Sequence, residues 1–194
     1  AEVIEAKEFI SAMIAANEDI WASQARKYGF SFSPAKMVIF SDRVNTACGA
    51  QSAGVGPFYC SGDRSIYLDM NFIDDMQRLG ASRNRQIAGN FAMAYVLAHE
   101  YGHHISHLSG VMSQAHQAMA NARTKADKNA ISVKLELQAD CFAGVWAGNL
   151  DFNKYKIRIS MKDLQAGIET AHAIGDDALS GSNNRENFTH GSSL

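Results

Sequence analysis

The stretch FAMAYVLAHEYGHH, residues 91 to 104, joins an apolar run to the pentapeptide HEYGH. Apolar residues recur in it at helical spacing and no proline interrupts it, so the stretch predicts an amphipathic helix. Residues four apart in a helix lie one turn apart on the same face. His99 and His103 can therefore converge on one metal ion, and neutral imidazoles are ligands that zinc accepts.

Glu100 directly follows the first of these histidines and points to the side of the pair. Its carboxylate can take a proton from a metal-activated water without binding the metal itself. The alternative is a helix that carries two histidines and no metal. Three fixed positions of uncommon residues arise by chance in a chain of this length in on the order of one case in a few hundred. We therefore favour a metal site with a built-in general base.

A catalytic zinc ion takes three protein ligands and keeps one open position, so a third ligand is needed. A straight helix carries His107 away from the ion. The long metzincin pattern requires Gly and His where this chain has Ile105 and Ser109, which excludes that class. We expect His104 and His107 to face solvent or to lie near the ligands. The candidates for the third ligand are the carboxylates and the other histidines: His104, His107, His116, His172 and His190.

The segment KLELQADC, residues 134 to 141, offers a better third ligand. Glu136 and Asp140 are four residues apart on a second predicted helix and share one face. Glu136 can complete a two-histidine, one-glutamate site, while Asp140 accepts a hydrogen bond from a ligand imidazole and orients it. Both could instead be solvated charges, but apolar neighbours on each side disfavour full exposure. No dense cysteine cluster closes a fourth position, so we expect an open, catalytic site.

The pattern along the chain predicts a small sheet followed by helices, which is the α+β class. The expected strands, both before the HEYGH helix, are residues 36 to 42 and 64 to 72. The expected helices are residues 2 to 28, a helix from near Ser82 or Asn84 to Leu108, and residues 113 to 129, 132 to 150 and 160 to 174. Residues 179 to 194 have the composition of a loop.

Composition is that of an ordinary folded domain, with 194 residues, 46% hydrophobic and 20% charged. We expect residues 1 to 194 to form a single domain. The formal net charge is -2, and lysine and arginine are scattered, so we do not expect nucleic acid as a partner. The longest apolar stretches fall far short of the ~20 residues that a membrane-spanning helix requires.

Cys48 and Cys60 flank a glycine-rich segment in which turns can bring two thiols together. We expect a disulfide between them, and hence an extracytoplasmic, oxidising compartment. The alternative is a pair of small buried thiols in a reduced protein. A metal pair is disfavoured because neither cysteine belongs to a CxxC motif. We expect Cys141 to pack as a small apolar residue.

The motifs HEYGHH and ELQADCFAGVWA, preceded by TACG and GPFYC and followed by AIGDD and FTHGSS, resemble the putative neutral zinc metallopeptidase family of bacteria. The matching segments run from about Thr46 to Ser193. The resemblance implies a zincin-type fold, with His99, His103 and Glu136 as zinc ligands and Glu100 as the general base. It also implies, for many members, a membrane anchor upstream of this chain.

Three further features carry hypotheses. His190, in FTHGSS, can stabilise the oxyanion of a tetrahedral intermediate, or it can be a histidine of the tail with no role. Asp176 and Asp177 can cap a turn or hold a ligand imidazole, and capping is the simpler interpretation. Residues 66 to 70 can pair with an extended peptide if they form an edge strand, but an interior strand would have the same pattern.

We expect the protein to be a zinc metallopeptidase that acts outside the cytoplasm. It would hydrolyse peptide or protein substrates with a metal-activated water. An alternative is a zinc-containing module of a membrane-associated complex that binds or scaffolds peptides without hydrolysis. Hydrolysis of a non-peptide amide would use the same residues.

Overall fold

The computed structural model describes residues 2–52, 54–82, 86–151, 154, 165 and 169. Its centre is a three-stranded sheet of order β1-β5-β4, in which β1 runs parallel and β4 antiparallel to the middle strand. These strands are β1 (Lys36–Phe40), β4 (Phe58–Cys60) and β5 (Ser65–Asp69). A separate antiparallel hairpin consists of β2 (Arg43–Thr46) and β3 (Gly49–Ser52). The mixed α+β class expected from the sequence is confirmed.

The middle strand, β5, is buried along its whole length. Ile66 and Leu68 belong to the clusters formed with the helices, while Tyr67 packs with Phe58 and Phe40 in a separate cluster. β5 is paired with β1 along its whole length and with β4 over Ser65–Tyr67, so it is an interior strand of the sheet and not an edge strand. The hypothesis that residues 66 to 70 form an edge for a peptide is therefore wrong.

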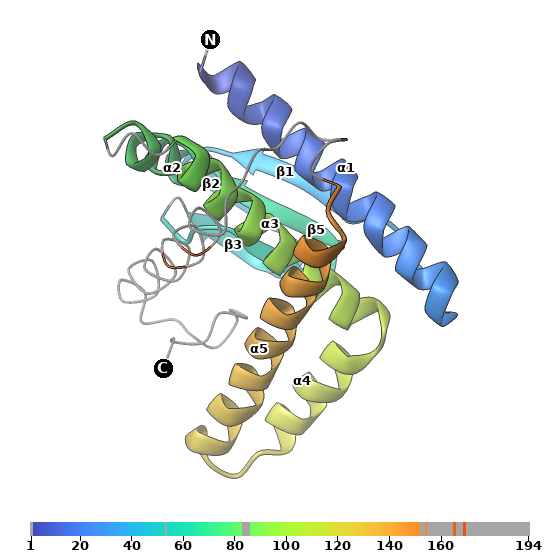
Figure 1. Cartoon of the computed structure of the whole chain (residues 1–194). Helices are drawn as coiled ribbons and strands as arrows, with labels where there is room; N and C mark the ends of the chain where they lie inside the picture. The colour runs from blue at the N-terminus through green and yellow to red at the C-terminus, as the bar shows by residue number, and fades with distance from the viewer. Residues whose placement is uncertain are drawn as a thin grey trace.

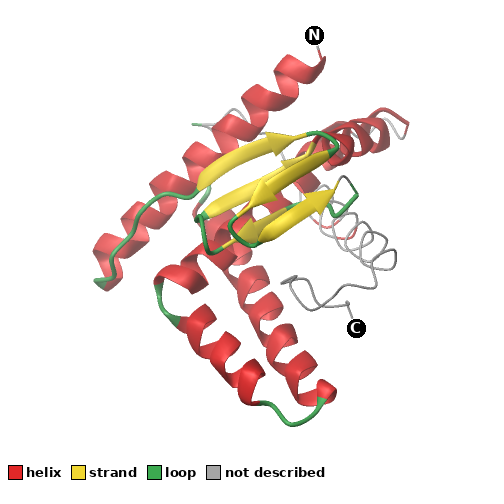
Figure 2. Ribbon diagram, turned by 180° about the vertical axis from the view of Figure 1, so that it is seen from behind, coloured by secondary structure: helices red, strands yellow, loops and turns green. Residues whose placement is uncertain are grey.

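Five helices complete the described fold: α1 (Glu2–Tyr28), α2 (Met70–Ser82), α3 (Gln86–Leu108), α4 (Val111–Asn121) and α5 (Lys125–Asn149). The strands lie in front of the helices when the molecule is seen from behind (Figure 2). In Figure 1, α4 and α5 form a helical hairpin that extends away from the sheet. Helices thus cover one face of a small sheet, as the sequence predicts.

Helix α2 was not expected, and it begins inside the predicted strand of residues 64 to 72. The strand ends at Asp69, whose carboxylate accepts a hydrogen bond from the backbone N–H of Asn71 at 2.9 Å. This side-chain bond satisfies one of the free N–H groups at the start of a helix. Phe72, Ile73 and Met76 then follow at helical spacing and are buried.

The expected boundary between the two helices after α3 was also wrong. α4 ends at Asn121, and α5 begins at Lys125 rather than at Ser132. The Thr124 hydroxyl accepts a hydrogen bond from the backbone N–H of Asp127 and caps α5. One long helix therefore carries both the polar segment and Glu136.

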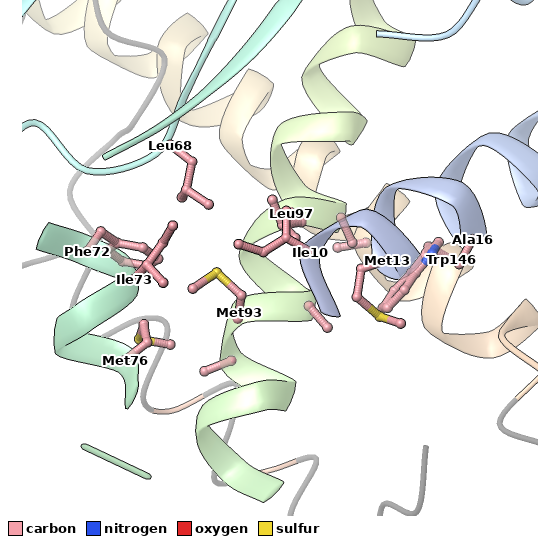
Figure 3. Packing of buried hydrophobic residues seen from close by; sticks show 14 of the residues in the cluster. Ile10, Met13, Ala16, Leu68, Phe72, Ile73, Met76, Met93, Leu97 and Trp146 are labelled. Carbon is pink, nitrogen blue, oxygen red and sulfur yellow. The ribbon is translucent and has the colours of Figure 1, made fainter. Parts of the chain in front are cut away.

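The core is organised around α3 (Figure 3). Met93 and Leu97 of this helix lie in the cluster with side chains from α1, α2 and β5 and with Trp146 of α5. Further along α3, Tyr101 and Ile105 join a second buried cluster beneath the sheet. Since α3 is packed along most of its length, the HEYGH segment is held in a fixed place.

The expected disulfide between Cys48 and Cys60 is present, with a Cα–Cα distance of 5.8 Å. It joins the turn of the β2–β3 hairpin to the end of β4. Cys141 is free and exposed on α5, so the expectation that it packs as an apolar residue was wrong. Across the described residues, no helix has both the length and the apolar character needed to cross a membrane.

Candidate metal centre

Two helices bring the three predicted ligands together. His99 and His103 lie one turn apart on α3, and Glu136 lies on α5. One donor atom of each side chain lies within 4.8 Å of the others. His99 Nε2 is 2.9 Å from Glu136 Oε2, and His103 Nε2 is 3.3 Å from Glu136 Oε1. No other such group of three ligand-type side chains occurs in the described part of the chain.

Asp140 lies one turn beyond Glu136 on α5, and its Oδ1 is 2.8 Å from His99 Nδ1. An ionised carboxylate can only accept hydrogen bonds, so with a metal ion on Nε2 the ring would donate its Nδ1–H to Asp140. The Nε2 atom of His99, on the opposite side of the ring, faces Glu136. This is the carboxylate–histidine–metal arrangement, in which the carboxylate fixes the tautomer and leaves the second nitrogen for the ion.

The donor set fits a divalent cation. A carboxylate oxygen faces each ring nitrogen of His99, and a second imidazole approaches the same glutamate. Two imidazoles and a glutamate are a known ligand set of catalytic zinc, with one coordination position left open. The side chains of His99 and Glu136 are each 13% exposed, so the centre lies near the surface but is not freely hydrated.

Glu100 is 1% exposed, and His103 is completely buried. A charged side chain is seldom buried to this degree without a structural or functional reason. Because Glu100 is the next residue after His99, its side chain leaves α3 in another direction from the two histidines. Glu100 is thus a buried carboxylate residue next in sequence to the first ligand, and it does not belong to the donor set.

Two residues near the centre were not assigned a role from the sequence. The Tyr95 hydroxyl donates a hydrogen bond to Asp140 Oδ1 at 2.7 Å. Gly102, the fourth residue of HEYGH, lies against Ala139 and Phe142 of α5. The sequence offers only weak signals for these two residues, the i, i+4 spacing of Tyr95 and His99 and a glycine inside a helix, and neither signal indicates the contact with α5.

Of the two places expected for His104, facing solvent or lying near the ligands, the first is wrong, because this side chain is completely buried. Its Nε2–H donates to the backbone carbonyl of Ser33, and the Tyr59 hydroxyl donates to its Nδ1, both at 2.6 Å. Burial lowers the pKa of His104, which favours this neutral form. His104 thus joins α3 to β4 and to the segment before β1. His107, one turn further, is half-buried.

Several predicted residues lie outside the described part of the chain: His172, Asp176, Asp177 and His190. The role of His190 as an oxyanion stabiliser stays a prediction. His116 lies on α4, is exposed and does not belong to the donor set. Of the helix expected at residues 160 to 174, Gln165 and Glu169 are described, and both are helical.

Residues 2–194 match a family described as putative neutral zinc metallopeptidase. The chain is 40% identical over 194 residues to the uncharacterized protein YpfJ of Escherichia coli strain K12, covering 97% of this chain and 64% of that protein. It is also 40% identical over 168 residues to the uncharacterized protein Rv2575 of Mycobacterium tuberculosis, covering 80% of this chain and 54% of that protein.

The chain therefore spans less than two thirds of the length of these relatives. No solved structure matches it. The zincin-type fold that the resemblance implies stays a prediction for this reason, whereas the sheet, the helices and the donor set are observed.

Proposed function

The chain belongs to the putative neutral zinc metallopeptidase family, and on that premise we propose that it is a zinc-dependent peptidase. The observation that carries the proposal is the convergence of two imidazoles and a glutamate to within 4.8 Å beside the buried Glu100. The substrate we propose is a peptide or protein, and the reaction is hydrolysis of a peptide bond by water.

His99, His103 and Glu136 would hold the zinc ion. When bound, zinc supplies a Lewis acid that polarises the scissile carbonyl and lowers the pKa of a water molecule. His₂Glu sites also accept cobalt or manganese, and zinc is favoured here by the family and by its availability. Asp140 keeps the His99 ring oriented through its hydrogen bond to Nδ1.

Glu100 is the proposed general base. Its carboxylate takes a proton from the attacking water as the new C–O bond forms, and it returns that proton to the amine nitrogen as the C–N bond breaks. Glu100 therefore ends the reaction in the protonation state in which it began. Burial of Glu100 supports this role, because a carboxylate shielded from bulk water exchanges its proton with the reacting groups rather than with solvent.

The alternative from another class is a zinc-containing module that binds or scaffolds peptides without cleaving them. A binding site of that kind has no need for a buried carboxylate beside the first ligand, so Glu100 favours the enzyme. Hydrolysis of a non-peptide amide would use the same donor set and the same base. Assays with peptide substrates and with non-peptide amides would distinguish these two kinds of hydrolysis.

The disulfide between Cys48 and Cys60 supports a location outside the cytoplasm, where such bonds persist. We propose that the protein acts in the periplasm or at the cell exterior. The membrane anchor implied by the family resemblance is part of this proposal for the whole protein.

The decisive experiment compares wild type with Glu100→Gln, measuring bound zinc by elemental analysis and cleavage of an unstructured protein substrate with and without chelator. Glu169→Gln is the matched control, because it makes the same change at an exposed position. We expect one zinc per chain in all three proteins and chelator-sensitive cleavage in wild type and Glu169→Gln only. Zinc without cleavage in wild type would favour the binding module, and absence of zinc would refute the metal centre.

A further inference from the structure

Two helical pairs face each other beside the donor set. On α3, Tyr95 precedes His99 by one turn, and on α5, Asp140 follows Glu136 by one turn. Oδ1 of Asp140 accepts two hydrogen bonds, from the Tyr95 hydroxyl at 2.7 Å and from His99 Nδ1–H at 2.8 Å. The hydroxyl and the imidazole are thus linked through a single carboxylate oxygen.

The Asp140 side chain is 31% exposed, so water can compete for it. The hydroxyl of the half-buried Tyr95, on α3, donates a hydrogen bond to this carboxylate and restrains it. A phenol that donates to an ionised carboxylate makes a charge-assisted hydrogen bond, which is stronger than a neutral one. Burial, together with the bond to Asp140, raises the pKa of Tyr95, so the phenol keeps its proton at physiological pH.

The bond also bears on the orientation of His99. An Asp140 carboxylate held by the Tyr95 hydroxyl keeps its Oδ1 directed at His99 Nδ1. The Nε2 atom, on the opposite side of the ring, then remains directed toward Glu136. The imidazole is therefore restrained in its orientation.

We propose that Tyr95 is a positioning residue of the metal centre, holding Asp140 so that Asp140 can hold His99. The inference deepens the proposed function and rests on the zinc site, but it does not depend on peptidase activity. Partners of this kind typically contribute 10- to 100-fold to metal affinity. Since Tyr95 acts through one intervening residue, we expect an effect of about tenfold, at the lower end of that range.

The test measures zinc affinity of the purified chain by competition with a chromophoric chelator. We expect Tyr95→Phe to bind zinc about tenfold more weakly than wild type. The matched control is Tyr101→Phe, the same change on the same helix, where the hydroxyl accepts a hydrogen bond from the Ala35 backbone N–H at 3.1 Å. This control should keep the affinity of wild type, because its hydroxyl serves the contact with the segment before β1.

A double-mutant cycle with Asp140→Ala separates positioning from a general loss of structure. If Tyr95 acts through Asp140, adding Tyr95→Phe to Asp140→Ala should change zinc affinity by less than twofold. Equal affinity of wild type and Tyr95→Phe, additive losses in the cycle, or an equal loss in Tyr101→Phe would each overturn the inference. Wild type that binds no zinc would overturn the metal centre, and with it the proposed function. Zinc binding without peptidase activity would leave the role of Tyr95 intact.

Discussion

Gly102 of α3 and Ala139 of α5 lie so close that a Cβ atom on the glycine would be 2.9 Å from the Ala139 carbonyl oxygen and 3.0 Å from its Cα. Real Cβ atoms essentially never approach backbone this closely. Ala139 lies between Glu136 and Asp140 in the sequence, so this contact sets the distance between the two helices at the donor set. The glycine of HEYGH therefore contributes to the site by allowing the two helices to pack closely.

Replacement of Gly102 by Ala should separate the helices. Overpacking of this kind costs about 1 to 3 kcal/mol, of which the better helix propensity of Ala returns up to about 1 kcal/mol. We expect a lower free energy of unfolding and weaker zinc binding, because Glu136 moves away from the histidines. Urea unfolding and chelator competition measure the two effects.

The matched control is Gly144→Ala on α5, where an added Cβ would meet nothing within 4 Å. This change should stabilise the protein by up to about 1 kcal/mol through helix propensity alone. If Gly102→Ala were as stable and bound zinc as tightly as this control, the contact with Ala139 would not determine the geometry of the site.

The donor set was predictable because its signals are local. The i, i+4 spacings of His99 with His103 and of Glu136 with Asp140 place each pair on one helical face, whatever the remainder of the chain does. The roles of Gly102 and Tyr95 were not predictable in this way. Both depend on where α5 lies against α3, which is a tertiary relationship that no local pattern encodes.

The sheet was predicted less well than the helices. β4 and the β2–β3 hairpin lie in a segment rich in glycine, where residues have little intrinsic preference for strands. Two side-chain interactions hold this segment: the Cys48–Cys60 bond, and the hydrogen bond that the Asp63 carboxylate accepts from the Ala47 backbone N–H at 3.2 Å. The disulfide was foreseen, but the strands that it joins were not.

Variants of Glu136 and Asp140 should have different effects on zinc, although both residues lie on the same face of α5. Glu136→Gln replaces a proposed ligand and should abolish stoichiometric zinc binding. Asp140→Asn should keep one zinc per chain but weaken its binding by about 10- to 100-fold, because the hydrogen bond that orients His99 is altered. Elemental analysis and chelator competition distinguish the two results.

Asp42→Asn serves as the control for these variants. Asp42 is exposed and has a φ of 63°, a conformation that Asn tolerates well. The Asp42→Asn variant should bind zinc as tightly as wild type does. Full zinc affinity in Glu136→Gln would remove this residue from the ligand set.

Loss of the disulfide should destabilise the protein without directly affecting the donor set. Cys48 and Cys60 are 12 residues apart in the sequence, and closing a loop of about this size contributes typically about 2 to 4 kcal/mol. The double variant Cys48→Ala with Cys60→Ala should therefore unfold at lower urea concentration. Cys141→Ser, at the free and exposed cysteine, should unfold as wild type does. Equal unfolding of the double variant and wild type would show that the hairpin is held by other contacts.

Stability should fall at alkaline pH because buried tyrosines keep their protons in the folded state. Burial is the largest cause of the raised pKa at four of them: Tyr59, Tyr67, Tyr95 and Tyr101. For Tyr67, burial and a 2.6 Å hydrogen bond to Asp63 raise the pKa from 10.0 to about 12. The unfolded chain therefore releases this proton at lower pH than the folded chain does.

The sign of the pH dependence follows from that difference. Below pH 10 the contribution of Tyr67 is fully present, and between pH 10 and about 12 the folded state holds more protons than the unfolded state. Stability then falls by up to about 1.4 kcal/mol per pH unit for each such tyrosine. Tyr67→Phe should make the alkaline decline shallower by about that amount, even though loss of the hydrogen bond lowers stability at neutral pH.

Urea unfolding at a series of pH values from neutral to alkaline measures this slope. All proteins should carry Cys141→Ser, because a free thiolate would attack the disulfide at high pH. Tyr28→Phe provides the control, since it removes a phenol that is 68% exposed. A Tyr67→Phe variant whose stability declined with pH as steeply as that of this control would mean that Tyr67 ionises alike in the folded and unfolded chains.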